Sequence, residues 1–180
     1  MDFTEKTIST REIYNGRIVH LKEDTVLLPD GKTAGRELVV HSGGVGVIAI
    51  DGDGNVLTVT QYRKPYDELV LEIPAGKLEP GEEPKAAGLR ELREETGYAA
   101  EKCTFIGKSY PTPGYCSEII HLYLAENLSW KGQQLDEGEF VEVKKIPLDT
   151  LVEMVMNNEL FDAKTCIAVL KADKIINKTK

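Results

Sequence analysis

The 180-residue sequence has few cysteines and no long apolar run. Its three cysteines, Cys103, Cys116 and Cys166, have no CxxC spacing, which argues against a zinc site or a disulfide scaffold and favours a reducing cytosol. No stretch reaches the roughly 18 apolar residues of a membrane span, and the first residues contain no apolar signal-peptide core. We therefore expect no membrane association.

Positive charge is also scarce. The chain has 22 Lys and Arg against 30 Asp and Glu, a net charge of −8. A general nucleic-acid binder presents a basic face to the phosphates, so this balance excludes nucleic acid as a partner. The 41% apolar content suffices for a substantial core, and the length fits one domain with an appended element. These counts predict a soluble cytoplasmic protein.

Turn residues and apolar periodicity divide the chain into strands and helices. Residues 8–40 are expected to form short strands around the turns Asn15-Gly16 and Pro29-Asp30-Gly31. Further strands are predicted at residues 45–50, 56–60, 69–73, 105–110, 119–125 and 140–146. Helices are predicted at residues 84–96, 149–157 and 162–173, with Asp149 and Asp162 as N-caps. This order predicts an α/β sandwich with a mixed sheet.

The helix predicted at residues 84–96 carries the densest group of carboxylates. Glu91, Glu94 and Glu95 stand at i, i+3 and i+4 and therefore share one helix face. The three carboxylates repel one another unless positive charge lies among them. Arg90 supplies part of that charge, and a divalent cation would supply more. Because oxygen ligands without a nearby histidine suit hard cations, the pattern favours Mg²⁺ or Mn²⁺ over zinc. A solvated surface helix is the alternative.

The loop before this helix adds a longer pattern. Five residues separate Gly76 from Glu82, and seven more precede the run Arg90-Glu91-Leu92-x-Glu94-Glu95-x-Gly97. This spacing resembles the Nudix box, the signature of the Nudix hydrolase family, and departs from it only at Tyr98, where an aliphatic residue is usual. The resemblance implies a Nudix-type α/β/α (α+β) sandwich with a mixed sheet. It also implies hydrolysis of a nucleoside diphosphate linked to another group.

The resemblance further implies roles for the residues of the motif. The implied metal ligands are Ala75 (through its carbonyl), Glu82, Glu91, Glu94 and Glu95. Glu91 and Glu95 would be the principal ligands, and Arg90 would orient the carboxylates. A metal suits this reaction because it stabilises the oxyanions of a diphosphate and activates water for in-line attack.

Segments outside the box resemble the ADP-ribose pyrophosphatase subfamily. They are Arg36-Glu37, Gln61-Tyr-Arg63-Lys-Pro65, Leu71 to Gly76, Pro113 with the Gly and Glu that follow it, and Asp162-Ala-Lys-Thr165. This similarity implies that Arg36 and Arg63 meet the substrate's phosphates, for which the guanidinium fork is suited. It places Pro113 and Glu118 at the substrate, Glu118 near the ribose. The alternatives are a surface charge for each arginine, a rigid turn for Pro113 and a solvated loop residue for Glu118.

The run Asp136-Glu137-Gly138-Glu139 predicts a mobile acidic loop that closes over bound substrate. By resemblance, a glutamate of this loop removes a proton from the attacking water, and Glu137 is preferred to Glu139 for this role. An ordinary polar hairpin is the alternative interpretation.

Taken together, the motifs predict Mg²⁺-dependent hydrolysis of ADP-ribose to AMP and ribose 5-phosphate. The subfamily resemblance also implies a homodimer, with an N-terminal β arm at residues 1–40 as the dimerisation element and a Nudix hydrolase domain at residues 41–180. Two alternatives remain open. One is a Nudix hydrolase of another sugar nucleotide or dinucleotide, such as a GDP-sugar or NADH, and the other is a catalytically silent domain that senses a nucleotide.

Overall fold

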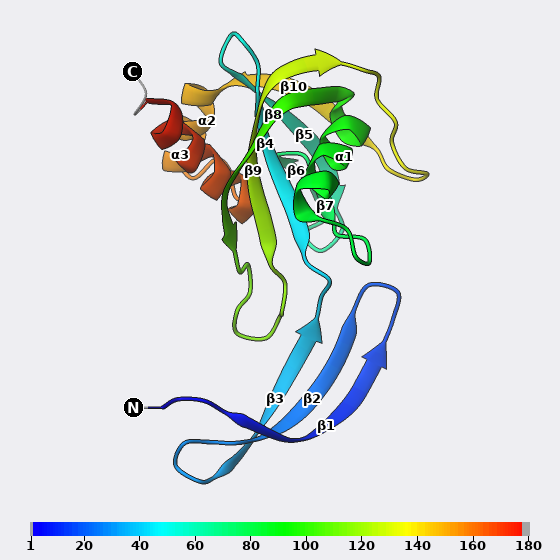
Figure 1. Cartoon of the computed structure of the whole chain (residues 1–180), viewed down its shortest axis with the longest axis vertical. Coiled ribbons are helices and arrows are strands. Elements are labelled where there is room, and N and C mark those ends of the chain that lie inside the picture. The colour runs from blue at the N-terminus through cyan, green and yellow to red at the C-terminus, as the bar shows by residue number, and fades with distance from the viewer. Residues whose placement is uncertain (1, 178–180) are drawn as a thin grey trace. The chain divides into compact units, whose positions relative to one another are not determined.

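The computed structural model describes residues 2–177 (Figure 1). Its strands are β1 (Lys6–Asn15), β2 (His20–Leu27), β3 (Thr33–Val40), β4 (Gly44–Ile50), β5 (Asn55–Arg63), β6 (Glu68–Glu72), β7 (Ala75–Lys77), β8 (Tyr98–Ser109), β9 (Ile120–Trp130) and β10 (Val141–Pro147). Its helices are α1 (Pro84–Thr96), α2 (Leu148–Met156) and α3 (Ala163–Asn177). Among the described residues, no helix is long and apolar enough to cross a membrane.

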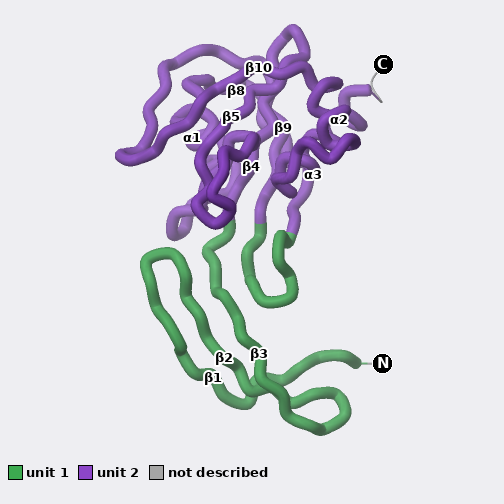
Figure 2. The backbone as a smooth tube through the Cα atoms, turned by 180° about the vertical axis from the view of Figure 1, so that it is seen from behind, with its two compact units in different colours: residues 1–43, 110–119 green, residues 44–109, 120–180 purple. Residues whose placement is uncertain are grey.

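The chain divides into two compact units, coloured separately in Figure 2. The first contains the chain up to Gly43 together with Tyr110–Ile119, and the second contains Gly44–Ser109 together with the chain from Ile120 onward. In the first unit, β1, β2 and β3 form an antiparallel sheet in that order. Its turns include the two predicted from the sequence, so the strands expected over residues 8–40 are confirmed.

The second unit contains a mixed sheet. Its strands run in the order β10-β5-β4-β9-β8, with β6 beside β5 and β7 beside β4. The β4–β9 pair is parallel, whereas the other pairs are antiparallel. Every residue of β4 is buried, because this central strand is covered on both faces.

Helices cover the two faces of this sheet (Figure 1), and each face has its own core. On β4, Ile48 and Ile50 pack into the cluster that contains residues of α2 and α3. Val45, Val47 and Ala49 pack into the cluster that contains residues of α1. This alternation follows from the two-residue period of a strand. The predicted α/β/α sandwich with a mixed sheet is therefore confirmed.

The predicted helix at residues 84–96 has the predicted limits. Pro84 is its first residue, and Gly97 ends it in the left-handed conformation, with φ +80° and its N–H bonded to the Arg93 carbonyl at 2.8 Å. A glycine adopts this conformation without a Cβ clash.

The predicted caps of the other helices differ in outcome. Asp162 caps α3, since its Oδ2 accepts a hydrogen bond from the Thr165 N–H at 3.0 Å. The prediction for Asp149 is wrong, because Pro147 occupies the N-cap position of α2 and Asp149 lies in the first helical turn. An acidic residue is favoured at both positions, so local sequence does not distinguish them.

Candidate active site

Arg90 lies at the centre of the carboxylate group on α1. Its Nε and Nη2 donate to Oε1 and Oε2 of Glu82 at 2.9 and 3.0 Å. Its Nη1 donates to Glu91 Oε1 and to Glu94 Oε2, each at 2.9 Å. The hydrogen bonds that Arg90 donates to Glu82 raise the pKa of Arg90 most, and Glu91 and Glu94 add to that effect. One guanidinium thus joins three of the five predicted metal ligands.

Glu95 lies on the buried side of the same helix. Its side chain is 4% exposed, and its Oε2 accepts a hydrogen bond from the Ala75 N–H at 2.9 Å. Burial raises the pKa of Glu95 to about 8, the Ala75 hydrogen bond opposes this rise, and the charges of Glu91 and Glu139 add to it. A carboxyl in this state is stabilised in its ionised form by a nearby cation.

Glu91 shares this environment and also lies against the backbone of the preceding loop. Burial raises its pKa, which Arg90 partly offsets. A Cβ built on Gly76 would lie 1.8 Å from Glu91 Oε1, so only glycine permits this approach. The glycine that begins the Nudix-type spacing therefore makes room for a carboxylate that is one of the predicted metal ligands.

The donor set fits a hard divalent cation, since it consists of oxygen atoms and includes a buried carboxyl with a raised pKa. As the side chains stand, residues 2–177 contain no group of three acidic, histidine or cysteine side chains arranged to enclose a metal ion. The carboxylates of Glu82, Glu91 and Glu94 instead contact Arg90.

The predicted acidic loop connects β9 to β10. Glu139 N–H donates to the Asp136 carbonyl at 3.0 Å, and Gly138 has φ +85°. The negative charge of Glu139 raises the pKa of both Glu91 and Glu95. The structure thus provides an electrostatic link from this loop to the metal-ligand candidates through Glu139.

Gln133, at the start of this loop, was missed by the sequence analysis. Its Nε2 donates to the Glu95 carbonyl at 2.6 Å, while Gln134 N–H donates to the Glu94 carbonyl at 3.1 Å. These bonds fix the loop to the last turn of α1, whose carbonyls have no partner within the helix. No local pattern marks a glutamine for this role.

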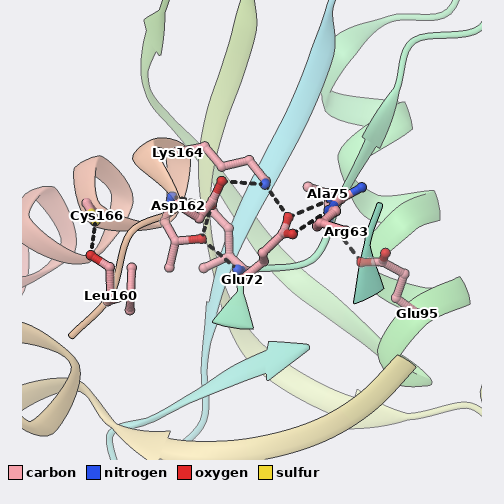
Figure 3. Close-up of polar contacts among 10 residues, drawn as sticks. Arg63, Glu72, Ala75, Glu95, Leu160, Asp162, Lys164 and Cys166 are labelled. Carbon is pink, nitrogen blue, oxygen red and sulfur yellow. Dashed lines mark hydrogen bonds and ion pairs between the residues drawn. The ribbon is translucent and has the colours of Figure 1, made fainter. Parts of the chain in front are cut away.

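Arg63 belongs to a second charged group, shown in Figure 3. Its Nε and Nη2 donate to Oε1 and Oε2 of Glu72 at 2.5 and 2.7 Å. Lys164 donates to Glu72 as well and to Asp162. Two of the segments noted for their subfamily resemblance, at residues 71–76 and 162–165, are therefore in direct contact.

The other predicted substrate residues belong to the first unit. Arg36 lies on β3, and its Nε and Nη2 donate to Glu5 at 2.9 and 2.5 Å. Pro113 is exposed in a turn, and Glu118 Oε1 lies 3.6 Å from Nδ1 of His41.

Comparison with known families identifies the class. A family model described as NUDIX domain matches residues 40–165. A second model, described as nucleoside diphosphate sugar hydrolase N-terminal domain, matches residues 5–39. The chain therefore belongs to the Nudix hydrolase family, as the spacing from Gly76 to Gly97 predicted. Hydrolases of this family generally use divalent metal ions.

Individual relatives are similar over nearly the whole chain. An ADP-ribose pyrophosphatase of Bacillus subtilis is 47% identical, with 92% of this chain and 90% of the relative covered. A methanol dehydrogenase activator of Bacillus methanolicus is also 47% identical, with 93% and 91% covered. The crystal structure of an ADP compounds hydrolase superposes with a TM-score of 0.87 at 19% identity, covering 99% of this chain and 98% of that one, which supports the fold.

Proposed function

We propose that the chain hydrolyses the diphosphate bond of ADP-ribose, giving AMP and ribose 5-phosphate, with Mg²⁺ as the cation. The observation that carries the chemistry is the buried carboxyl of Glu95, bonded to Ala75 N–H beside the carboxylates that Arg90 holds. The similarity to a relative named ADP-ribose pyrophosphatase supports the substrate.

The proposed metal ligands are Ala75 (carbonyl), Glu82, Glu91, Glu94 and Glu95, and Mn²⁺ is a chemically similar substitute for Mg²⁺. The cation, when bound, supplies positive charge against the diphosphate oxygens and lowers the pKa of water. Arg90 keeps Glu82, Glu91 and Glu94 in fixed relative positions through its hydrogen bonds.

A glutamate of the acidic loop is proposed as the general base. We now favour Glu139 over Glu137, because the charge of Glu139 acts on Glu91 and Glu95. A carboxylate close to the metal ligands is well placed to accept a proton from water whose pKa a metal has lowered.

Arg63 is proposed to bind the substrate's diphosphate, and Arg36, in the first unit, keeps the role of phosphate contact that the subfamily resemblance implies. A guanidinium that already forms two parallel bonds to a carboxylate, as each does here, has the geometry that matches phosphate oxygens. Pro113 and Glu118 keep their proposed roles at the substrate, Glu118 as an acceptor for ribose hydroxyls.

Product analysis tests this function. The protein is incubated with ADP-ribose and Mg²⁺ in H₂¹⁸O, and the products are identified by mass spectrometry. We expect AMP and ribose 5-phosphate in equal amounts, with ¹⁸O in the one whose phosphorus is attacked. A Glu95→Gln variant is the control for contaminating hydrolases. Intact ADP-ribose, or equal turnover by the variant, contradicts the proposal.

A second candidate function follows from the methanol dehydrogenase activator, which is as similar to the chain as the pyrophosphatase is. On this alternative the chain increases the activity of a methanol dehydrogenase. Adding wild type or the Glu95→Gln variant to a purified methanol dehydrogenase separates the two functions. Activation by wild type supports the alternative, and activation by both shows that it does not require the proposed hydrolase chemistry.

We also propose a cytoplasmic homodimer formed through the N-terminal arm. All residues of β1 are exposed, including the apolar side chains of Ile8 and Tyr14, at 56% and 59%. Exposed apolar side chains grouped on one strand are typical of an interface. Sedimentation of wild type and of an Ile8→Lys, Tyr14→Lys double variant tests this: a dimer that becomes a folded monomer is expected, and a monomeric wild type contradicts it.

A further inference from the structure

We propose that Lys164 is a positioning residue for Arg63: it shares the buried carboxylate of Glu72, so Glu72 orients the Arg63 guanidinium but neutralises less of its charge, and that charge attracts a diphosphate. This inference rests on the proposed hydrolysis of a nucleoside diphosphate sugar and deepens it. It assigns a function to Asp162-Ala-Lys-Thr165 beyond starting a helix.

The contacts form a group of alternating charges, in which Glu72 and Lys164 are buried and the Arg63 side chain is 39% exposed (Figure 3). Glu72 is 1% exposed and accepts two hydrogen bonds from Arg63, at 2.5 and 2.7 Å. Lys164, at 9% exposure, donates to the same Oε2 that Arg63 Nη2 contacts, and to Asp162 Oδ1 at 3.0 Å. Two cations and two carboxylates balance one another, which a buried charged group requires.

The position of Lys164 opposes the usual preference of a helix. It lies in the first turn of α3, where the helix dipole disfavours a cation. Asp162 caps this turn through Oδ2 while Oδ1 accepts from Lys164. The start of α3 therefore directs a cation to Glu72, at a cost to local helix stability that the contact with Glu72 offsets.

The same helix start fixes the segment that leads to the proposed metal site. Thr165 Oγ1 accepts from the Ile73 N–H at 2.9 Å, and the Pro74 carbonyl accepts from the Val47 N–H at 2.9 Å. Ala75 N–H donates to Glu95 at 2.9 Å. Each of the three residues from 73 to 75 therefore forms a backbone hydrogen bond that fixes its position.

Removing the Lys164 ammonium increases the share of the Glu72 charge that Arg63 neutralises. Burial raises the pKa of Glu72, but Arg63 and Lys164 together bring it below its usual value. Without Lys164, the whole charge of Glu72 is balanced by Arg63 alone. The guanidinium then pairs more tightly with Glu72 and attracts a phosphate less, so substrate binding weakens while the metal ligands are unaffected.

The test compares Lys164→Met, Lys164→Arg and the control Lys171→Met, which removes an exposed lysine from the same helix. With ADP-ribose and Mg²⁺ we expect Lys164→Met to raise KM on the order of tenfold and change kcat by less than about threefold, because Arg63 then attracts the ground state and the transition state less by the same amount. Lys164→Arg, which keeps the positive charge, is expected to have a KM close to that of wild type. Lys171→Met is expected to have the kcat and KM of wild type. Inhibition by inorganic pyrophosphate weakens in parallel with KM.

Thermal denaturation shows whether each variant is folded, and Lys164→Gln, which keeps a hydrogen-bond donor, replaces Lys164→Met if that variant does not fold. An unchanged KM and pyrophosphate inhibition in a folded, uncharged variant overturns the inference. The inference is also overturned if kcat falls in proportion to the loss of stability in each variant, since that result indicates a purely structural role for Lys164. If wild type does not hydrolyse ADP-ribose, the proposed function fails, and calorimetric pyrophosphate binding by the same variants still tests Lys164, with on the order of tenfold weaker binding expected.

Discussion

Replacing Glu95 by glutamine is expected to have opposite effects on two properties: it raises the stability of the metal-free protein and lowers its turnover in Mg²⁺. The Glu95 carboxyl has a pKa of about 8 in the folded chain, against an ordinary value of 4.5. Between these values the folded state holds a proton that the unfolded state has lost, so stability in the absence of metal falls as the pH rises from about 4.5 to about 8. Glutamine has no such proton, and its Oε1 retains the hydrogen bond from Ala75.

The magnitude follows from the two pKa values. Each tenfold change in proton affinity is worth about 1.4 kcal/mol, so Glu95 destabilises the metal-free protein by about 5 kcal/mol above pH 8. For a domain of this size 1 kcal/mol shifts Tm by about 2–4 °C. Metal-free Glu95→Gln is therefore expected to melt on the order of 10 °C above wild type at pH 9, and within about 3 °C of it at pH 5.

Thermal denaturation in EDTA between pH 5 and pH 9 measures this difference. Glu94→Gln is the matched control, because the Glu94 side chain is 31% exposed and bonded to Arg90. In the presence of Mg²⁺, the turnover of Glu95→Gln falls by about three orders of magnitude through loss of a metal ligand. Melting curves for wild type and Glu95→Gln that shift in parallel with pH would refute the assignment of a buried, proton-binding carboxyl.

Two further predictions concern the loop before α1 and the acidic loop. Gly76→Ala places a Cβ against the Glu91 carboxylate, the end of a flexible side chain, and is expected to displace it. We expect kcat to fall by about 100-fold and the free energy of unfolding to change by less than about 1 kcal/mol. Gly52→Ala, where nothing lies within 4 Å, is expected to change neither, and denaturation and kinetics check both variants. Glu139→Gln is expected to lower kcat by about 100-fold and Glu137→Gln by less than about threefold, as measured from pH–rate profiles of both variants. The larger loss of kcat in Glu137→Gln would identify Glu137 as the general base instead.

Local sequence patterns identified the elements that local interactions determine. Pro84 and Gly97 limit α1, and its structure begins and ends where they predict. β7 was missed because Ala75–Lys77 is too short to show periodicity and forms by pairing with β4. β8 begins at Tyr98 rather than at residue 105, since its first residues pair with the end of β9 at Leu128 to Trp130.

The site divides in the same way. The Arg90–Glu94 pair is an i, i+4 contact that helix geometry predicts, and the structure contains it. Lys164 and Glu72 are 92 positions apart, so both segments were noted but their contact was not. Only the packing of α3 against the mixed sheet brings these residues together.

The most direct test of the proposed function is kcat/KM for ADP-ribose, ADP-glucose, GDP-mannose, NADH and a nucleoside triphosphate, each with Mg²⁺ and with EDTA. We expect a clear preference for ADP-ribose, with activity that is lost in EDTA and restored by Mg²⁺. Preference for GDP-mannose or NADH would retain the metal site and contradict the proposed substrate. Hydrolysis of none of these compounds would contradict the proposed activity and favour a nucleotide-sensing domain.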